Sequence, residues 1–184
     1  YRNEKTRLVI GDGTIIREYV TINRGTAIGG ETKIGKQCFL MAYAHVAHNC
    51  SIGDEVIMAN NATIGGHVRI EDQAVLGGLV AVHQFVRIGK LAMLGGGAMV
   101  SLDVPPFTQA CGDRAKLYGL NIVGLRRHGY SRETITALKK AYRVLFRSRL
   151  MFAEAIEKIE NQFFNPEVKY LVDFLKSSSR GFCR

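Results

Sequence analysis

The sequence predicts a mainly β fold, in which a parallel β-helix of hexapeptide repeats is followed by a small C-terminal α-helical domain. Three observations lead to this prediction. A large aliphatic residue or methionine recurs at every sixth position from Ile10 to Val100, a double proline follows the pattern, and the residues after Ser131 show helical periodicity. Neither a helix nor an isolated strand has a side-chain period of six, whereas hexapeptide repeats are typical of a parallel β-helix.

The repeat has two defining positions. The aliphatic position is filled in sixteen consecutive hexads, by Ile10, Ile16, Ile22, Ile28, Ile34, Leu40, Val46, Ile52, Met58, Ile64, Ile70, Leu76, Val82, Ile88, Leu94 and Val100, without a break in phase. The residue four positions later is small or β-branched throughout. Glycine often follows the aliphatic residue, as in IGKQC and LGGLV, and we expect it to supply the unusual φ/ψ of a turn. Three hexads make one triangular coil, so residues 18 apart lie above one another.

Three segments follow from these patterns. Residues 1–106 form the β-helix domain, which ends at LDVPPF because Pro105 and Pro106 withdraw backbone donors. Residues 107–130 form a connector. Residues 131–184 form the helical domain, with Ser131 as the N-cap of a first helix, a second helix at 152–163, and a third that begins around Pro166 and ends near Gly181.

Composition narrows the class of protein. The formal net charge of +9 favours acidic partners, although nucleic acid is not expected because no recognised motif or run of interleaved aromatics accompanies the charge. No apolar run approaches the roughly 20 residues that cross a bilayer, so we expect no stable membrane insertion. The four cysteines lack metal or disulfide spacing, which favours a reducing compartment. The chain starts at Tyr1 without a signal peptide, and we expect that its natural N-terminus has been removed.

Four of the five histidines are expected on one strip of the β-helix. The hexads that start at Val46, Ile64 and Val82 stack, and they carry His48, His67 and His83. His45 lies at the edge leading onto the strip, Asn49 lies beneath His67, and Gln84 follows His83.

Three interpretations of this strip stay open on the residues alone. The histidines can be satisfied structural groups, or three imidazoles can hold a catalytic zinc, although no acidic residue lies beside them to orient a ligand. Alternatively, His48 is a general base oriented by Asn49, with the backbone N–H of Gly66 as an oxyanion donor.

The motifs AHVAHNC, GGHV, AVHQF, DVPPF and GLNIVGLRRHG resemble those of the UDP-N-acetylglucosamine O-acyltransferase family, over essentially the whole chain but without the family's earliest coils. The resemblance implies a left-handed β-helix and a homotrimer with clefts between subunits. It implies transfer of an (R)-3-hydroxyacyl group from acyl carrier protein to the glucosamine 3-hydroxyl of UDP-N-acetylglucosamine, the first step of lipid A synthesis. It further implies no bound metal and no cofactor except the donor's 4′-phosphopantetheine, in the bacterial cytoplasm or a plant organelle.

The same resemblance implies the residue roles. His48 matches the general base and Gly66 the oxyanion donor. The remaining matches line the substrate, pantetheine and acyl sites: His45, His67, His83, Gln84, Asn121, Arg127 and His128, with Gly96 at the floor of the acyl groove.

Four residues, at three places in the sequence, depart from the family pattern. Asn49 stands where the family usually has Asp beside the base, Asn23 replaces a His, and Val123 with His128 replaces a Glu and an Arg. An amide holds an imidazole but does not offset the charge of an imidazolium, and the comparable change in a serine protease triad lowers the rate greatly. Two alternatives therefore accompany the acyltransferase: a non-catalytic homologue that binds the acyl carrier or nucleotide sugar, and a zinc-dependent hydratase of the same fold.

Overall fold

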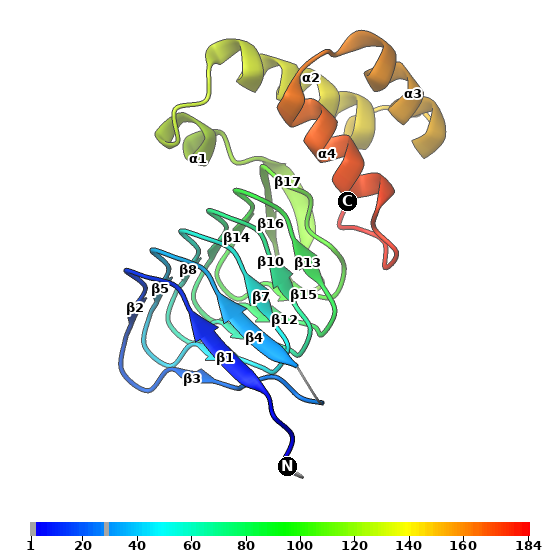
Figure 1. The fold of residues 1–184 in the computed structure, drawn as a ribbon. Helices are drawn as coiled ribbons and strands as arrows, with labels where there is room; N and C mark the ends of the chain where they lie inside the picture. Colours follow the sequence, from blue (N-terminus) through cyan, green and yellow to red (C-terminus); the bar gives the residue numbers. More distant parts are fainter. Residues whose placement is uncertain (1–2, 28–29) are drawn as a thin grey trace.

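The computed structural model describes residues 3–27 and 30–184 and shows a three-sided parallel β-solenoid capped by helices at one end (Figure 1). Face A contains β1 (Arg7–Ile10), β4 (Glu31–Ile34), β7 (Ser51–Ile52), β10 (Arg69–Ile70) and β13 (Arg87–Ile88). Face B contains β2 (Ile15–Ile16), β5 (Phe39–Leu40), β8 (Ile57–Met58), β11 (Val75–Leu76), β14 (Met93–Leu94), β16 (Thr108–Cys111) and β17 (Lys116–Leu120). Face C contains β3 (Thr21–Ile22), β6 (His45–Val46), β9 (Thr63–Ile64), β12 (Ala81–Val82) and β15 (Met99–Val100). The predicted solenoid is confirmed, while the left-handed winding that the resemblance implies stays a prediction.

The predicted stacking of residues 18 apart holds above β4 but is wrong for the first coil. Lys33 pairs with Ser51, 18 residues later, whereas Arg7 pairs with Glu31 and Thr21 with His45, 24 residues later. One whole hexad, around Thr26, therefore leaves the three faces between β3 and β4. Ile28, which the repeat assigned to the aliphatic position, lies outside the described residues.

The turns between faces contain a residue with positive φ, but it is not the glycine after the aliphatic residue, as the sequence predicted. The fourth position of the hexad has positive φ, at 59° for Asn49 and 61° for Asn61, as in the second central residue of a type II turn. The glycines after the aliphatic residues serve a different purpose, because a Cβ added at Gly65 would lie 2.8 Å from the backbone nitrogen of Gln84 in the next coil. Close approach between coils, rather than positive φ, requires these glycines.

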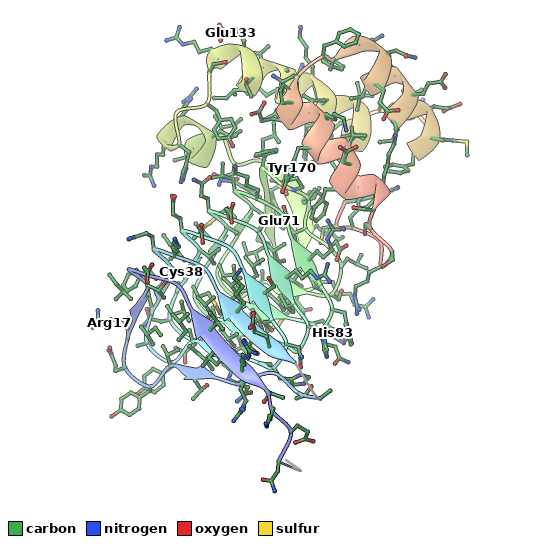
Figure 2. All side chains as sticks on the ribbon, in the orientation of Figure 1. Arg17, Cys38, Glu71, His83, Glu133 and Tyr170 are labelled. Atoms are coloured by element: carbon green, nitrogen blue, oxygen red, sulfur yellow. The ribbon has the colours of Figure 1, made fainter. Side chains whose placement is uncertain are left out.

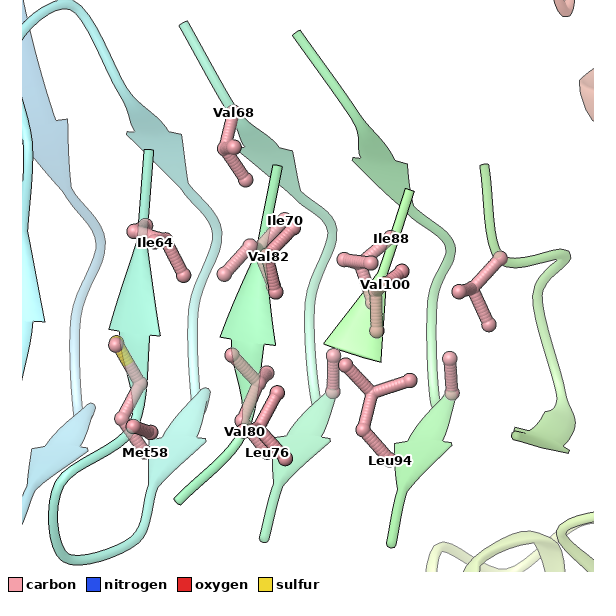
Figure 3. Packing of buried hydrophobic residues seen from close by; sticks show 14 of the residues in the cluster. Met58, Ile64, Val68, Ile70, Leu76, Val80, Val82, Ile88, Leu94 and Val100 are labelled. Carbon is pink, nitrogen blue, oxygen red and sulfur yellow. The ribbon is translucent and has the colours of Figure 1, made fainter. Parts of the chain in front are cut away.

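The interior of the solenoid is filled by the residues that the repeat assigned to it. From Ile34 to Val100 every aliphatic position is buried, and so is every small or β-branched position from Thr32 to Val104. Figure 3 shows Ile64, Val82 and Val100 stacked on one face, opposite Met58, Leu76 and Leu94. At the open end, Ile10 and Ile16 are exposed because no strand of the described residues packs below them.

Residues 107–130, which the sequence predicted to be a connector, contain two strands and a short helix. Strand β16 continues face B by parallel pairing with β14, and β17 adds an antiparallel strand beside it. Helix α1 (Ile122–Arg127) follows, with Asn121 as its N-cap. The side-chain oxygen of Asn121 accepts from the N–H of Gly124, and its amide nitrogen donates to the carbonyl of Leu91, so the turn is fixed to the solenoid.

Three further helices form the predicted helical domain. Helix α2 (Arg132–Arg147) begins after Ser131, whose hydroxyl accepts from the N–H of Thr134 at 3.1 Å, as the N-cap prediction requires. Helix α3 (Phe152–Gln162) and the start of helix α4 (Pro166–Lys176) also agree with the sequence. The predicted end of α4 near Gly181 is wrong: the helix stops at Lys176, and residues 177–184 return along the solenoid (Figure 1).

Polar contacts join the helices to face A. The hydroxyl of Tyr170 donates to Glu71 at 2.8 Å, and the two side chains lie together in Figure 2. Burial and this carboxylate raise the pKa of Tyr170 above its ordinary value, so the phenol remains a donor at neutral pH. Among the described residues, no helix is long and apolar enough to span a bilayer.

Candidate active site

The corner between faces C and A carries two stacked rows of side chains. One row consists of His48, Gly66 and Gln84, and the next consists of Asn49, His67 and Phe85, each residue 18 positions from the last. The N–H of His67 donates to the carbonyl of His48 and the N–H of Phe85 to the carbonyl of Gly66, which locks successive turns in register. The corner is therefore a rigid scaffold rather than a mobile loop.

His48 and Asn49 form the central pair of this corner. His48 Nδ1 lies 2.9 Å from Asn49 Oδ1, and the same oxygen accepts hydrogen bonds from the backbone N–H of Thr26 at 3.0 Å and from its hydroxyl at 2.7 Å. The Asn49 backbone N–H in turn donates to the hydroxyl of Thr32 at 2.8 Å. Thr26 thus fixes the side chain of Asn49, and Thr32 fixes its backbone.

This arrangement defines the tautomer of the neutral His48 imidazole. A backbone N–H only donates, so Thr26 requires the oxygen of the Asn49 amide, and not its nitrogen, at this point. The oxygen cannot donate to His48, so Nδ1 carries the proton and Nε2 of the neutral ring is left as an acceptor. Asn49 therefore sets the tautomer that a general base needs, which an aspartate would also set.

Gly66 leaves the room that the His48 ring occupies. A Cβ added at Gly66 would lie 2.7 Å from His48 Cε1 and 2.9 Å from Nε2. The backbone N–H of Gly66 has no acceptor in the part of the chain that the structure describes. Gly66 thus has a free backbone donor and packs against the His48 ring, so the donor and the imidazole can act on one substrate.

The structure brings together only part of the predicted histidine strip. The His48 and His67 rings are in edge contact at 5.2 Å between centroids, and His67 stacks on Phe85 at 4.7 Å. His45 is hydrogen-bonded to the hydroxyl of Thr21 at 2.7 Å.

His83 and Gln84 are exposed at the upper end of the strip. The Arg180 guanidinium donates to His83 Nδ1 at 2.9 Å. Only His48 and His67 are in ring contact within one chain, whereas His45 and His83 are hydrogen-bonded to Thr21 and Arg180.

The remaining predicted residues lie farther up or around the solenoid. Gly96 lies at the corner between faces B and C, where an added Cβ would be 3.3 Å from the carbonyl of Gly78. Asn121 is buried as a helix cap, whereas Arg127 and His128 are exposed at the end of α1. One chain thus does not place Gly96 on the corner that holds His48.

Two clefts flank the central pair. The lower cleft, about 420 Å³, is lined by His48 with Asn23, Arg24 and Thr26, among others. The basic cleft, about 820 Å³, lies on face A and includes Asn49, His67 and Arg69. His48 thus borders the lower cleft and Asn49 the basic cleft, and two clefts at one corner suit a reaction between two substrates.

Neither a metal centre nor a cysteine nucleophile is indicated. Within residues 3–27 and 30–184, no group of three or more His, Cys, Asp or Glu side chains is arranged to hold a metal ion. The Cys50 thiol, which follows Asn49, lies 3.1 Å from the carbonyl of Gly65, and burial raises its pKa to about 11. It therefore stays protonated and is a poor nucleophile at neutral pH.

Sequence reasoning missed Thr26, Phe85, Arg69, Arg87 and Arg180. Thr26 belongs to the hexad that leaves the faces, which nothing in the repeat marks. Arg69 and Arg87 occupy the position before the aliphatic residue, 18 apart, and this spacing was a usable signal.

The fold and this corner define a hexapeptide-repeat transferase. A model of bacterial transferase hexapeptides matches residues 31–66, and a model described as UDP-N-acetylglucosamine O-acyltransferase, domain 2, matches residues 103–183. The acyl-[acyl-carrier-protein]–UDP-N-acetylglucosamine O-acyltransferases of Halorhodospira halophila and Thermodesulfovibrio yellowstonii are 49% and 55% identical, each over 100% of this chain and 72% of the relative. The chain belongs to the UDP-N-acetylglucosamine O-acyltransferase family, and it is an O-acyltransferase.

Solved structures agree with this assignment. The UDP-N-acetylglucosamine acyltransferase of Arabidopsis has a TM-score of 0.96 and 37% identity, covering 100% of this chain and 68% of that one. The enzyme of Bacteroides fragilis also has a TM-score of 0.96, with 40% identity, covering 100% of this chain and 72% of that one.

Proposed function

We propose that this chain transfers an (R)-3-hydroxyacyl group from acyl carrier protein to the glucosamine 3-hydroxyl of UDP-N-acetylglucosamine, with His48 as general base. The observation that carries the proposal is the hydrogen-bonded series Thr26, Asn49 and His48, which leaves Nε2 as an acceptor. The ring packs against Gly66, whose N–H has no acceptor among the described residues. The names of the relatives supply the two substrates.

The chemical steps balance without a metal or a covalent enzyme intermediate. His48 Nε2 accepts the proton of the sugar hydroxyl while its oxygen attacks the thioester carbonyl carbon. The resulting oxyanion accepts a hydrogen bond from the N–H of Gly66. The C–S bond then breaks, the ester remains on the sugar, and the imidazolium returns its proton to the departing pantetheine thiolate. The chain's own residues thus move one proton from oxygen to sulfur.

The other residues have supporting roles in this proposal. His67 lies against the His48 ring and lines the basic cleft, so it contacts the bound substrates. His45, His83, Gln84, Arg127 and His128 line the path of the substrates along the corner. Asn121 acts indirectly, because both ends of its amide are used to fix α1.

A homotrimer completes the site in this proposal. Gly96, proposed as the floor of the acyl groove, lies at a different corner from His48, so the two meet only between chains that pack side by side. The free thiols suit a reducing compartment, and we propose the bacterial cytoplasm as the location.

The test is to incubate the protein with UDP-N-acetylglucosamine and a panel of (R)-3-hydroxyacyl carrier proteins, and to locate the acyl group on the product by NMR. We expect an ester at the 3-oxygen, with one chain length preferred. A parallel reaction with the 3-amino sugar analogue shows whether the enzyme prefers to form an amide. Acylation at another position, or acyl transfer to water alone, would contradict the proposal.

A further inference from the structure

The basic cleft on face A has a charge pattern that the proposed reaction does not explain. Its lining includes His67, Arg69, Arg87 and Ser177 together with one acidic residue, Glu71, and its volume is about 820 Å³. It borders the catalytic corner, because Asn49 and His67 also line it. The cleft is too large for a lone inorganic ion and suits an extended organic molecule.

Two arginines of this cleft lie on neighbouring strands in direct register. Arg69 of β10 pairs with Arg87 of β13, and coils are about 4.8 Å apart, so the side chains leave the same face as neighbours. Like charges directly opposite each other on a sheet are destabilising. An anion between them would remove this repulsion.

The internal partners of the two arginines are unequal. The Arg87 guanidinium donates to the hydroxyl of Ser177 at 3.0 Å, lies 4.2 Å from the centre of the Phe174 ring, and lies 3.9 Å from Glu71. Glu71 is itself occupied by Tyr170 and by the backbone N–H of Lys90. The Arg69 guanidinium has no hydrogen bond or ion pair with any described residue, although its backbone N–H donates to the carbonyl of Val86. Its charge is therefore available to a ligand.

The segment that carries the two serines of the cleft is fixed to the solenoid by hydrogen bonds. The buried carboxylate of Asp103 accepts from the backbone N–H of Arg87 at 2.8 Å and from the hydroxyl of Ser178 at 2.8 Å. The Arg180 guanidinium donates to the carbonyl of Ser101 at 2.8 Å. These contacts hold residues 177–180 against the last coil, which places the Ser177 and Ser179 side chains at the cleft beside the arginines.

We infer that the basic cleft is a phosphate-binding subsite, in which Arg69 and Arg87 hold a phosphoryl group carried on an organic arm. Guanidinium groups bind phosphate oxygens through paired N–H donors, and serine hydroxyls add further donors. The inference rests on the proposed function for its two sources of such a group, the diphosphate of the nucleotide sugar and the phosphodiester of the donor's pantetheine arm.

The test compares Arg69→Gln and Arg69→Lys with Arg17→Gln, which removes the same charge from a surface ion pair with Glu18 far from the cleft (Figure 2). Steady-state kinetics vary each substrate in turn. We expect Arg69→Gln to raise one KM about tenfold with little change in kcat, Arg69→Lys to have a smaller effect, and Arg17→Gln to have none. A rise for UDP-N-acetylglucosamine identifies the diphosphate, and a rise for acyl carrier protein identifies the pantetheine phosphate.

Two further measurements keep the inference separate from the proposed function. Calorimetric titration with UDP and with 4′-phosphopantetheine tests binding even in a protein that transfers no acyl group, and one of the two is expected to bind Arg69→Gln about tenfold more weakly. The thermal midpoint of the unliganded Arg69→Gln variant is expected to equal or exceed that of the wild type, because repulsion is relieved. Unchanged KM values and unchanged binding, or equal losses in Arg17→Gln, would overturn the inference while leaving the role of His48 intact.

Discussion

Replacing His48 with alanine is expected to lower kcat by about 10³-fold, within the range that general base catalysis contributes, or about 4 kcal/mol of barrier. The variant should still fold, since the Asn49 oxygen keeps both donors from Thr26 and the His48 carbonyl still accepts from His67. The loss should appear in kcat rather than in substrate binding, because His48 acts on the hydroxyl only as the reaction proceeds.

The measurement is the rate of acyl transfer at saturating concentrations of both substrates, with the thermal midpoint as a control for folding. Binding of UDP-N-acetylglucosamine is measured as well, because a folded His48→Ala variant retains it and an unfolded one does not. Turnover within tenfold of the wild type would remove His48 from the mechanism.

A single methyl group at Gly66 is expected to lower activity by about 10²-fold or more. The added Cβ would lie 2.7 Å from the His48 ring, and the glycine cannot easily shift because its carbonyl accepts from the N–H of Phe85 in the next coil. The imidazole must therefore rotate away from Asn49 and from the N–H of Gly66, which disrupts both the base and the oxyanion donor.

The matched control for this change is Gly78→Ala. Gly78 occupies the same turn position at another corner, where an added Cβ would lie 3.4 Å from the carbonyl of Asn60, an ordinary contact. Both variants should keep the wild-type thermal midpoint to within a few degrees, which excludes a general effect of a methyl group in these turns. Wild-type turnover in Gly66→Ala would show that the His48 ring does not work in the position described.

The sequence predicted the solenoid because its core depends on one side chain in six. Ile34, Leu40 and Val46 are the last residues of strands on three successive faces, and their burial follows from the period alone. The break in the first coil was not predictable in this way. An extra segment of one whole hexad preserves the phase of the aliphatic positions, so the loop that carries Thr26 looks like another rung of the repeat.

Two other features could not be predicted from the sequence: the reason for the turn glycines and the end of helix α4. Glycine after the aliphatic residue suggested positive φ, but contact between coils is a property of the assembled solenoid and no local pattern reports it. Helix α4 ends before Ser177 because the residues beyond it contact Asp103 and Ser101, which lie more than 70 positions earlier in the chain. Long-range contacts of this kind override helical propensity.

The sequence predicted those neighbours in the candidate site that are set by the stacking of residues 18 apart. A separation of 18 placed Gly66 beside His48 and Asn49 beneath His67, as the structure has them. The same rule placed His83 on the strip but said nothing of Arg180, which comes from the far end of the sequence and is its partner. The orientation of the Asn49 amide depends on Thr26 and was therefore out of reach of the repeat.

The central claim is that Asn49 gives His48 the tautomer that an aspartate would. The most direct measurement is kcat/KM for Asn49→Asp, with Asn61→Asp as a control at the same turn position and with φ of 61°. Since Thr26 already orients the amide oxygen toward His48, we expect the wild type to be active. We expect kcat/KM of Asn49→Asp to exceed that of the wild type by about tenfold or less, from the added negative charge alone. An inert wild type that gains about 10⁴-fold, as expected if its imidazole has the wrong tautomer, would contradict it.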